Sequence, residues 1–123
     1  MSVKRLPDSE LEVMQALWAC KIPAARADIE RIVNTTRPIA QTTLLTLLSR
    51  LTEKGFIRVE KAGRIPQYYP LITQQDYLAS QSRRFLDKLC GGSIPTFAAA
   101  LCDSGLSKQE LAQLRDLLER DGL

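Results

Sequence analysis

The chain has 123 residues, of which 45% are hydrophobic and 25% are charged, and its formal net charge at pH 7 is +3. This length allows one compact domain, or one small domain with an extension that borrows its core from elsewhere, and it excludes two large independent domains. No apolar stretch approaches the roughly 20 residues of a membrane-spanning helix, and the first residues have no signal-peptide pattern, so we expect a cytoplasmic protein with no membrane partner.

Two amphipathic helices are predicted at the start of the chain. Ser9 and Glu12 have the spacing of a capping box, so the first helix should span about residues 9–20 and end before Pro23. Its apolar positions recur at helical intervals: Leu11, Met14 and Trp18. The second helix is RADIERIVN, and the stretch TTRP after it should form a turn. Its apolar positions are Ile29, Ile32 and Val33.

The third predicted helix, about residues 41–54, has two contrasting faces and is closed by Gly55. One face is a buried stripe of Leu44, Leu47, Leu48 and Leu51. The opposite face carries Thr42, Thr46, Ser49 and Glu53, flanked by Thr43, Leu45 and Arg50. Because Thr has poor helix propensity, an exposed helix face would more often carry Lys, Glu, Gln or Ala. We therefore expect this hydroxyl face to contact something outside the chain, with a solvated face of accidental composition as the alternative.

A β-hairpin should follow the third helix. Ile57 and Val59 alternate with polar residues, Gln67–Leu71 form a second strand-like run, and the loop KAGRIP between them carries Lys61 and Arg64 at its tip. One of the two tyrosines within the second run should face the core and the other the outside.

The last third of the chain should be helical. The stretch 73–90 forms a helix stopped by two glycines, the segment IPTFAAALC follows, and Ser107 with Glu110 opens a final helix with a capping box. Some 50 residues of amphipathic helix cannot bury their apolar stripes alone, so we infer a homodimer. The expected dimerisation residues are Leu78, Phe85, Leu89, Leu101, Leu111, Leu114 and Leu118.

The element order predicts a mainly α protein with a small β-hairpin: a winged helix-turn-helix DNA-binding domain at 1–72 and a helical dimerisation domain at 73–123. Residues 1–72 carry 11 Lys and Arg against 7 Asp and Glu, a charge of +4, whereas residues 73–123 carry 6 against 7, a charge of −1. This asymmetry is compatible with a first part that meets phosphate and a second part that meets protein.

In a winged helix the third helix enters the major groove of duplex DNA. Thr hydroxyls and the Gln41 amide suit contact with base edges. The side chains expected at phosphates are Arg37, Ser49, Arg50, Lys61 and Arg64. The alternative for each basic residue is plain surface charge, and Arg50 has the further alternative of pairing with Glu53 or Glu60. A two-fold dimer would require a pseudo-palindromic target.

Catalysis and metal binding find little support in the sequence. The chain has no His, no Gly-rich phosphate loop and no Cys pair at metal-ligand spacing, so we expect no enzyme, no metal site and no cofactor. The three cysteines are widely spaced, which favours free thiols over disulfides. Two further interpretations stay open: a winged-helix module for protein association, and a regulator that responds through the thiol of Cys90 or Cys102.

The stretches LPDSELEVMQALW, TTLLTLLSRLTEKGFI and QYYPL together resemble the penicillinase-repressor family of transcription regulators, of the BlaI, MecI and CopY type. The likeness extends to the glycine pair and to LSKQELAQLRDLL. The resemblance implies a dimeric repressor on a palindromic operator, released by a signal that the sequence does not identify. The recognition positions that the resemblance implies are Gln41, Thr42, Thr43, Leu45 and Thr46, with the wing at 61–66.

This sequence departs from that family at two places. Relatives that repress β-lactam resistance often carry basic side chains where this chain has Thr42 and Leu45, which implies a different operator sequence. The Asn-Phe bond at which such relatives are cleaved corresponds here to Ala99 and Ala100, so a different sensor protease or a different signal is implied. The Cys-x-Cys metal site of the copper-responsive branch is absent from this sequence.

Overall fold

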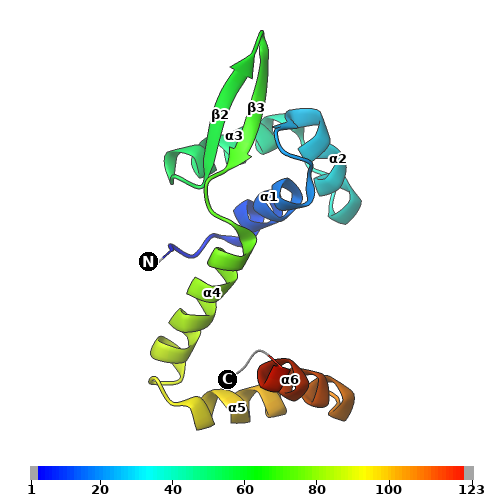
Figure 1. Ribbon diagram of the computed structural model, residues 1–123. Coiled ribbons are helices and arrows are strands. Elements are labelled where there is room, and N and C mark those ends of the chain that lie inside the picture. The colour runs from blue at the N-terminus through cyan, green and yellow to red at the C-terminus, as the bar shows by residue number, and fades with distance from the viewer. Residues whose placement is uncertain (1–2, 121–123) are drawn as a thin grey trace. The chain divides into compact units, whose positions relative to one another are not determined.

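The computed structural model describes residues 3–120, which form two compact units divided after Gln81 (Figure 1). The first unit contains α1 (Asp8–Ala19), β1 (Ala24–Ala25), α2 (Arg26–Thr36), α3 (Gln41–Glu53), β2 (Ile57–Ala62), β3 (Ile65–Pro70) and the first turns of α4 (Gln74–Arg84). The second unit contains the end of α4, the π-helical turn η1 (Phe85–Leu89), α5 (Ile94–Asp103) and α6 (Lys108–Arg120). The predicted fold class, mainly α with a winged helix-turn-helix, is confirmed.

Helix α1 begins at Asp8, and the capping box predicted at Ser9 and Glu12 is wrong. Pro7 occupies the N-cap position, and no side chain caps the first turn. Proline needs no partner for a backbone N–H, and its φ of −58° leads directly into helical geometry. Glu12 instead forms an ion pair with Arg37, 2.8 Å away, which joins α1 to the end of α2.

The core of the first unit lies among α1, α2 and α3. The predicted leucine stripe of α3 is confirmed, since all four leucines are buried and belong to the core cluster that includes residues of α1 and α2. Helix α2 continues through Thr36, so the turn to α3 begins at Arg37, later than the predicted TTRP turn. Its start is held by the Asp28 carboxylate, which accepts a hydrogen bond from the Ala25 N–H at 3.2 Å.

The hairpin is longer than the sequence predicts. Strands β2 and β3 pair from Ile57 opposite Pro70 to Ala62 opposite Ile65, so the predicted KAGRIP loop is wrong and only Gly63 and Arg64 lie between the strands. A two-residue hairpin turn requires a positive φ, and Gly63 supplies it at +68°. Strand β1 pairs with the outer edge of β3 and completes a three-stranded antiparallel sheet, in the order β1-β3-β2.

The first turns of α4 belong to the first unit. The Tyr77 hydroxyl accepts a hydrogen bond from the Leu6 N–H at 2.9 Å, and the Val3 N–H donates to the Ser80 hydroxyl at 2.8 Å. The indole of Trp18 donates to the Ile72 carbonyl at 2.9 Å, in keeping with the structural role expected from its place on the apolar stripe. The compact unit therefore extends past residue 72, where the sequence places the domain boundary.

The second unit is a set of capped helices with few buried side chains. The predicted capping box of α6 is confirmed, because the Glu110 N–H donates to Ser107 at 3.0 Å and the Ser107 N–H donates to Glu110 at 2.9 Å. Within residues 82–120 only Leu86 and Cys90 are buried, and neither α5 nor α6 contains a buried residue. Phe85 and Phe97 pack edge to face, with ring centroids 5.3 Å apart.

Candidate nucleic-acid interface

Helix α3 presents a polar face to solvent. Its apolar stripe is buried in the core, where Leu47, the most accessible of the four leucines, is 6% exposed. The exposed residues of the helix are Gln41, Thr42, Thr43, Leu45, Thr46, Ser49, Arg50, Thr52 and Glu53. All the residues that the sequence assigns to base contact therefore lie on the accessible side of one helix. Their role at DNA stays a prediction.

One hydroxyl on this face already donates its proton inside the helix. The Thr46 hydroxyl donates to the Thr42 carbonyl at 3.0 Å. Side chains of Thr commonly form this bond to the preceding turn. The oxygen of Thr46 therefore keeps only its acceptor capacity for a group outside the protein.

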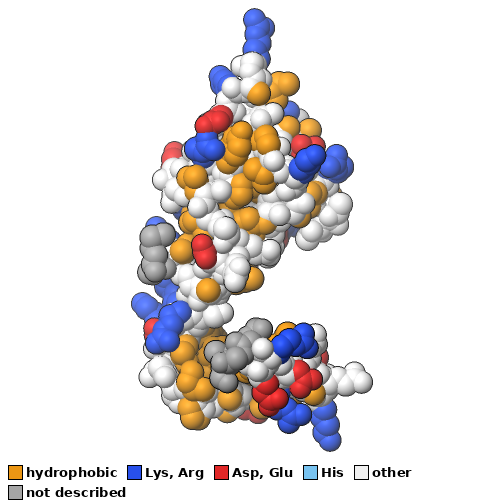
Figure 2. Space-filling view, in the orientation of Figure 1, with side chains coloured by type: hydrophobic (Ala, Val, Ile, Leu, Met, Phe, Trp, Pro, Cys, Tyr) orange, Lys and Arg blue, Asp and Glu red, His pale blue; other side chains and the backbone are white. Residues whose placement is uncertain are grey.

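The basic residues beside α3 differ in how free they are. Arg37 is held by Glu12, although more than half of its side chain stays exposed. Arg50, Lys61 and Arg64 are exposed, and within residues 3–120 none of the three forms an ion pair. Glu60 pairs with Arg58 instead, so the alternative of an Arg50–Glu60 pair is not formed. Figure 2 shows basic side chains at the tip of the hairpin, where β2 turns into β3.

The two tyrosines of β3 face opposite sides of the sheet, as predicted. Tyr68 is buried in the core, and Tyr69 lies under the guanidinium of Arg58, whose central carbon is 4.2 Å from the ring centroid. Arg58 and Tyr69 are directly opposed in the strand register. Sequence reasoning missed this cation–π contact, because only the register of the hairpin brings the two residues together.

A groove lies between the start of α2, the exposed face of α3 and strand β3, and we call it the Leu45 groove. Its volume is about 280 Å³, and it is lined by Ala25, Arg26, Ala27, Leu45, Ile65, Pro66 and Tyr68. The Nε atom of Arg26 is buried and has no hydrogen-bond partner within the described chain. Burial raises the pKa of the Tyr68 phenol, and the charge of Arg26 opposes that shift.

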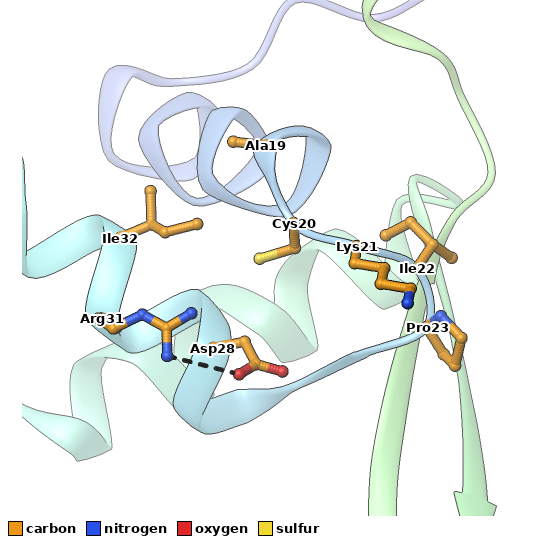
Figure 3. Close-up of a pocket in the computed structure, with 8 residues that line it drawn as sticks. All are labelled: Ala19, Cys20, Lys21, Ile22, Pro23, Asp28, Arg31 and Ile32. Atoms are coloured by element: carbon orange, nitrogen blue, oxygen red, sulfur yellow. Dashed lines mark ion pairs between the residues drawn. The ribbon is translucent and has the colours of Figure 1, made fainter.

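A second cavity, of about 400 Å³, lies at the end of α1 beside α2 (Figure 3). Cys20 faces it together with Asp28 and Arg31, whose charged groups are 3.8 Å apart. Burial raises the pKa of the Cys20 thiol, the Asp28 carboxylate raises it further, and Arg31 lowers it. The thiol therefore stays protonated at neutral pH and is a poor nucleophile and a poor metal ligand.

The remaining chemistry-bearing groups are dispersed. Within residues 3–120 no three His, Cys, Asp or Glu side chains are placed to hold a metal ion. Cys90 is buried and Cys102 is exposed on α5, so the thiol-responsive alternative stays untested. None of the helices that the structure describes is long and apolar enough to cross a membrane.

The apolar residues assigned to dimerisation are largely uncovered. Leu89 is 75% exposed, and Leu78, Phe85 and Leu118 are also exposed, while Leu101, Leu111 and Leu114 are half-buried. Figure 2 shows hydrophobic side chains gathered on the visible surface of the second unit. The predicted cleavage region, Ala99 and Ala100, lies inside α5, with Ala99 exposed and Ala100 half-buried.

Comparison with known proteins gives consistent matches over nearly the whole chain. The family model of the penicillinase repressor matches residues 6–120. The methicillin resistance regulatory protein MecI of Mammaliicoccus sciuri is 32% identical over 116 residues, which are 94% of each chain. The penicillinase repressor of Bacillus licheniformis is 29% identical over 118 residues, 95% of this chain and 91% of that protein.

A solved structure matches as well. It is the solution structure of the Bacillus licheniformis BlaI monomeric form in complex with the blaP half-operator. The match has a TM-score of 0.52 and 30% sequence identity, and it covers 62% of this chain and 92% of that chain.

Proposed function

Because this chain belongs to the penicillinase repressor family, whose members are DNA-binding transcriptional repressors and not enzymes, we propose that two copies of it bind a pseudo-palindromic operator. The third helix and the wing of each copy contact one half-site. The BlaI protein whose structure is similar was solved on a half-operator, which supports the same mode of binding here.

The observation that carries this proposal is the division of α3 into a fully buried leucine stripe and an exposed face of hydroxyl, amide and leucine side chains. A helix with short polar side chains outward fits the floor of the major groove, where base edges present hydrogen-bonding groups and the thymine methyl. We assign base contact to Gln41, Thr42, Thr43, Leu45 and Thr46.

Phosphate contact falls to the exposed basic groups around that helix. Arg64 occupies the two-residue turn of the wing, and Lys61 is the next-to-last residue of β2. Arg50 and Ser49 lie further along α3, toward its end. Arg37 contributes less than these, because its guanidinium is already bound to Glu12.

A homodimer is supported by the second unit. Its helices bury two residues between Ser82 and Arg120, which is too little apolar burial to hold them in place in water. Its exposed leucines supply the apolar area that a second copy would cover. The two-fold axis of such a dimer would place two α3 helices on one DNA duplex.

The test of DNA binding is a salt titration by fluorescence anisotropy, using duplexes that the full chain enriches from a randomised library. Arg64→Ala should weaken binding to all sequences alike. It should also make the negative slope of log K against log salt shallower, by about 0.9 for each phosphate that the variant no longer neutralises. Lys108→Ala, which removes the same charge from the first turn of α6, should change neither quantity.

The competing interpretation is a winged-helix module that associates only with proteins. It predicts that no duplex is enriched and that the full chain shows no preference over random DNA at moderate salt. That outcome would refute the repressor proposal.

Release from the operator requires a signal that separates the two copies or loosens their hold on DNA. One route is proteolysis between Ala99 and Ala100 by a sensor protease, which would separate α6 from the rest of the second unit. The bond lies inside a helix, so α5 must unwind before a protease can bind it in extended form. Within one copy α5 contains no buried residue, so the contacts that oppose this unwinding are those with the second copy.

A further inference from the structure

Leu45 belongs neither to the buried leucines of α3 nor to its exposed polar side chains. The other four leucines of the helix are buried, whereas Leu45 is 40% exposed among threonines and a serine. The core does not need it, because the stripe at positions 44, 47, 48 and 51 already fills the helical interval that faces the core, against α1 and β2. Its apolar side chain is available for a partner.

The surroundings of Leu45 extend this apolar contact toward the wing. Leu45 lines the groove of about 280 Å³ together with Ile65 and Pro66 of β3, and Ile65 is 60% exposed. Arg26 brings a positive charge to the same groove. An apolar surface beside a cation, continuous with the face of α3 that we assign to base contact, matches the edge of a DNA duplex better than it matches an uncharged protein surface.

We propose that Leu45 contacts the C5-methyl group of a thymine and thereby selects a T·A pair in each operator half-site. This inference rests on the proposed function and goes further by naming the base that position 45 of α3 selects. The thymine methyl is the one apolar group that a base pair presents in the major groove. A leucine has no hydrogen-bonding group, so a cytosine amino group or a guanine oxygen facing it would lose its water without gaining a partner.

The experiment removes that methyl group alone. The full chain is first used to enrich duplexes from a randomised library, and each thymine of the enriched sequence is then replaced in turn by deoxyuridine, in both half-sites together. Binding of the wild type, Leu45→Ala, Leu45→Met and Leu71→Ala is measured by fluorescence anisotropy. Leu71 is an exposed leucine in the same unit that does not line the Leu45 groove, so it serves as the matched control.

For the wild type, one thymine position should show a loss of about fourfold in affinity per half-site, the effect of one methyl group no longer buried. Leu45→Ala should bind the thymine and deoxyuridine duplexes within about twofold of each other, because the side chain that reads the methyl is gone. Leu45→Met, which keeps an apolar contact, and Leu71→Ala should retain the wild-type loss.

Two results would overturn the inference while leaving the proposed function intact: enriched duplexes in which no deoxyuridine weakens wild-type binding, or a deoxyuridine effect that Leu45→Ala shows in full. Failure of the full chain to enrich any sequence would overturn the proposed function and this inference together.

Discussion

At the scale of the residue, Thr46 differs from its neighbours on α3 because its proton is already used. The hydrogen bond to the Thr42 carbonyl leaves the Thr46 oxygen as an acceptor toward the outside. In the major groove the base donors are the adenine 6-amino and the cytosine 4-amino groups. At the base pair that Thr46 contacts, we therefore expect a preference for adenine or cytosine on the contacted strand.

Replacing Thr46 by Val keeps the shape and the methyl group but removes the acceptor. Thr46→Val should lower the preference at one base pair by about 1 kcal/mol, the net value of one hydrogen bond. Thr46→Ser keeps the acceptor and should keep the preference. The measurement is anisotropy against duplexes that differ from the enriched sequence at single base pairs, and an unchanged preference profile for Thr46→Val would contradict the assignment.

At the scale of the element, α1 and the end of α3 are joined by an ion pair that sequence inspection did not reveal. The Lys54 ammonium is 2.5 Å from a Glu10 carboxylate oxygen, and the two side chains are 26% and 4% exposed. Lys54 is also the C-cap residue of α3. A nearly buried carboxylate depends on its partner, since an unpaired charge inside a protein is far more costly than an exposed one.

Lys54→Met removes that partner and should lower the free energy of unfolding by about 2–3 kcal/mol, somewhat less than for a fully buried pair because Lys54 is partly exposed. The double variant Glu10→Gln with Lys54→Met should recover part of the loss. Urea unfolding followed by circular dichroism measures both. Lys61→Met, on the exposed wing, is the control, and equal effects at positions 54 and 61 would show that the ion pair has no structural role.

The attachment of α4 to the first unit gives a separate prediction. Tyr77→Phe removes the acceptor of the buried Leu6 N–H and should cost about 1–3 kcal/mol of stability. Tyr69→Phe should stay within about 0.5 kcal/mol of the wild type, because the contact with Arg58 involves the ring. The same urea unfolding measures both variants. A neutral Tyr77→Phe would indicate that this hydrogen bond contributes little to fixing α4 to the unit.

Local patterns in the sequence predict the elements that depend on local contacts. The leucine stripe of α3, the left-handed glycine after it, at φ +82°, and the capping box of α6 all involve residues within one or two helical turns. The predicted capping box of α1 is wrong because Pro7, and not Ser9, is the N-cap residue, and Glu12 is paired with Arg37, a partner 25 positions away. Strand β1 escapes prediction because two alanines carry no alternation, and only pairing with β3 makes them a strand.

In the candidate site, too, the sequence predicts the part that depends on local spacing and misses the part that depends on distant contacts. The exposed residues of α3 could be predicted, because 3.6-residue periodicity alone places them opposite the leucines. The Leu45 groove could not be predicted, since it assembles the start of α2, the middle of α3 and strand β3. Its residues are far apart in the sequence and share no spacing.

At the scale of the whole molecule, the second unit of one copy is incomplete. Helices need a covered apolar face to be stable in water, and α5 and α6 cover none of theirs fully in the described structure. A leucine such as Leu89, 75% exposed, contributes almost nothing to the stability of a single chain. If a second copy covers it, the same side chain contributes to association in both copies.

Leu89→Lys therefore distinguishes a monomer, in which Leu89 stays exposed, from a dimer, in which a second copy covers it. If the protein is a monomer, the substitution should be neutral. If it is a dimer, the substitution should raise the dissociation constant at least a hundredfold. Each copy would lose the burial of a leucine, about 1.5–3 kcal/mol, and would have to bury a charge. Sedimentation velocity at micromolar concentration measures this, with Leu71→Lys, at a 54% exposed leucine of the first unit, as the control.

Since two half-sites on one duplex are bound jointly only by a linked pair, Leu89→Lys should also reduce operator affinity to that for a single half-site. Identical sedimentation of wild type and both variants would mean that the second unit is covered in some other way, and the two-fold arrangement on DNA would have to be abandoned.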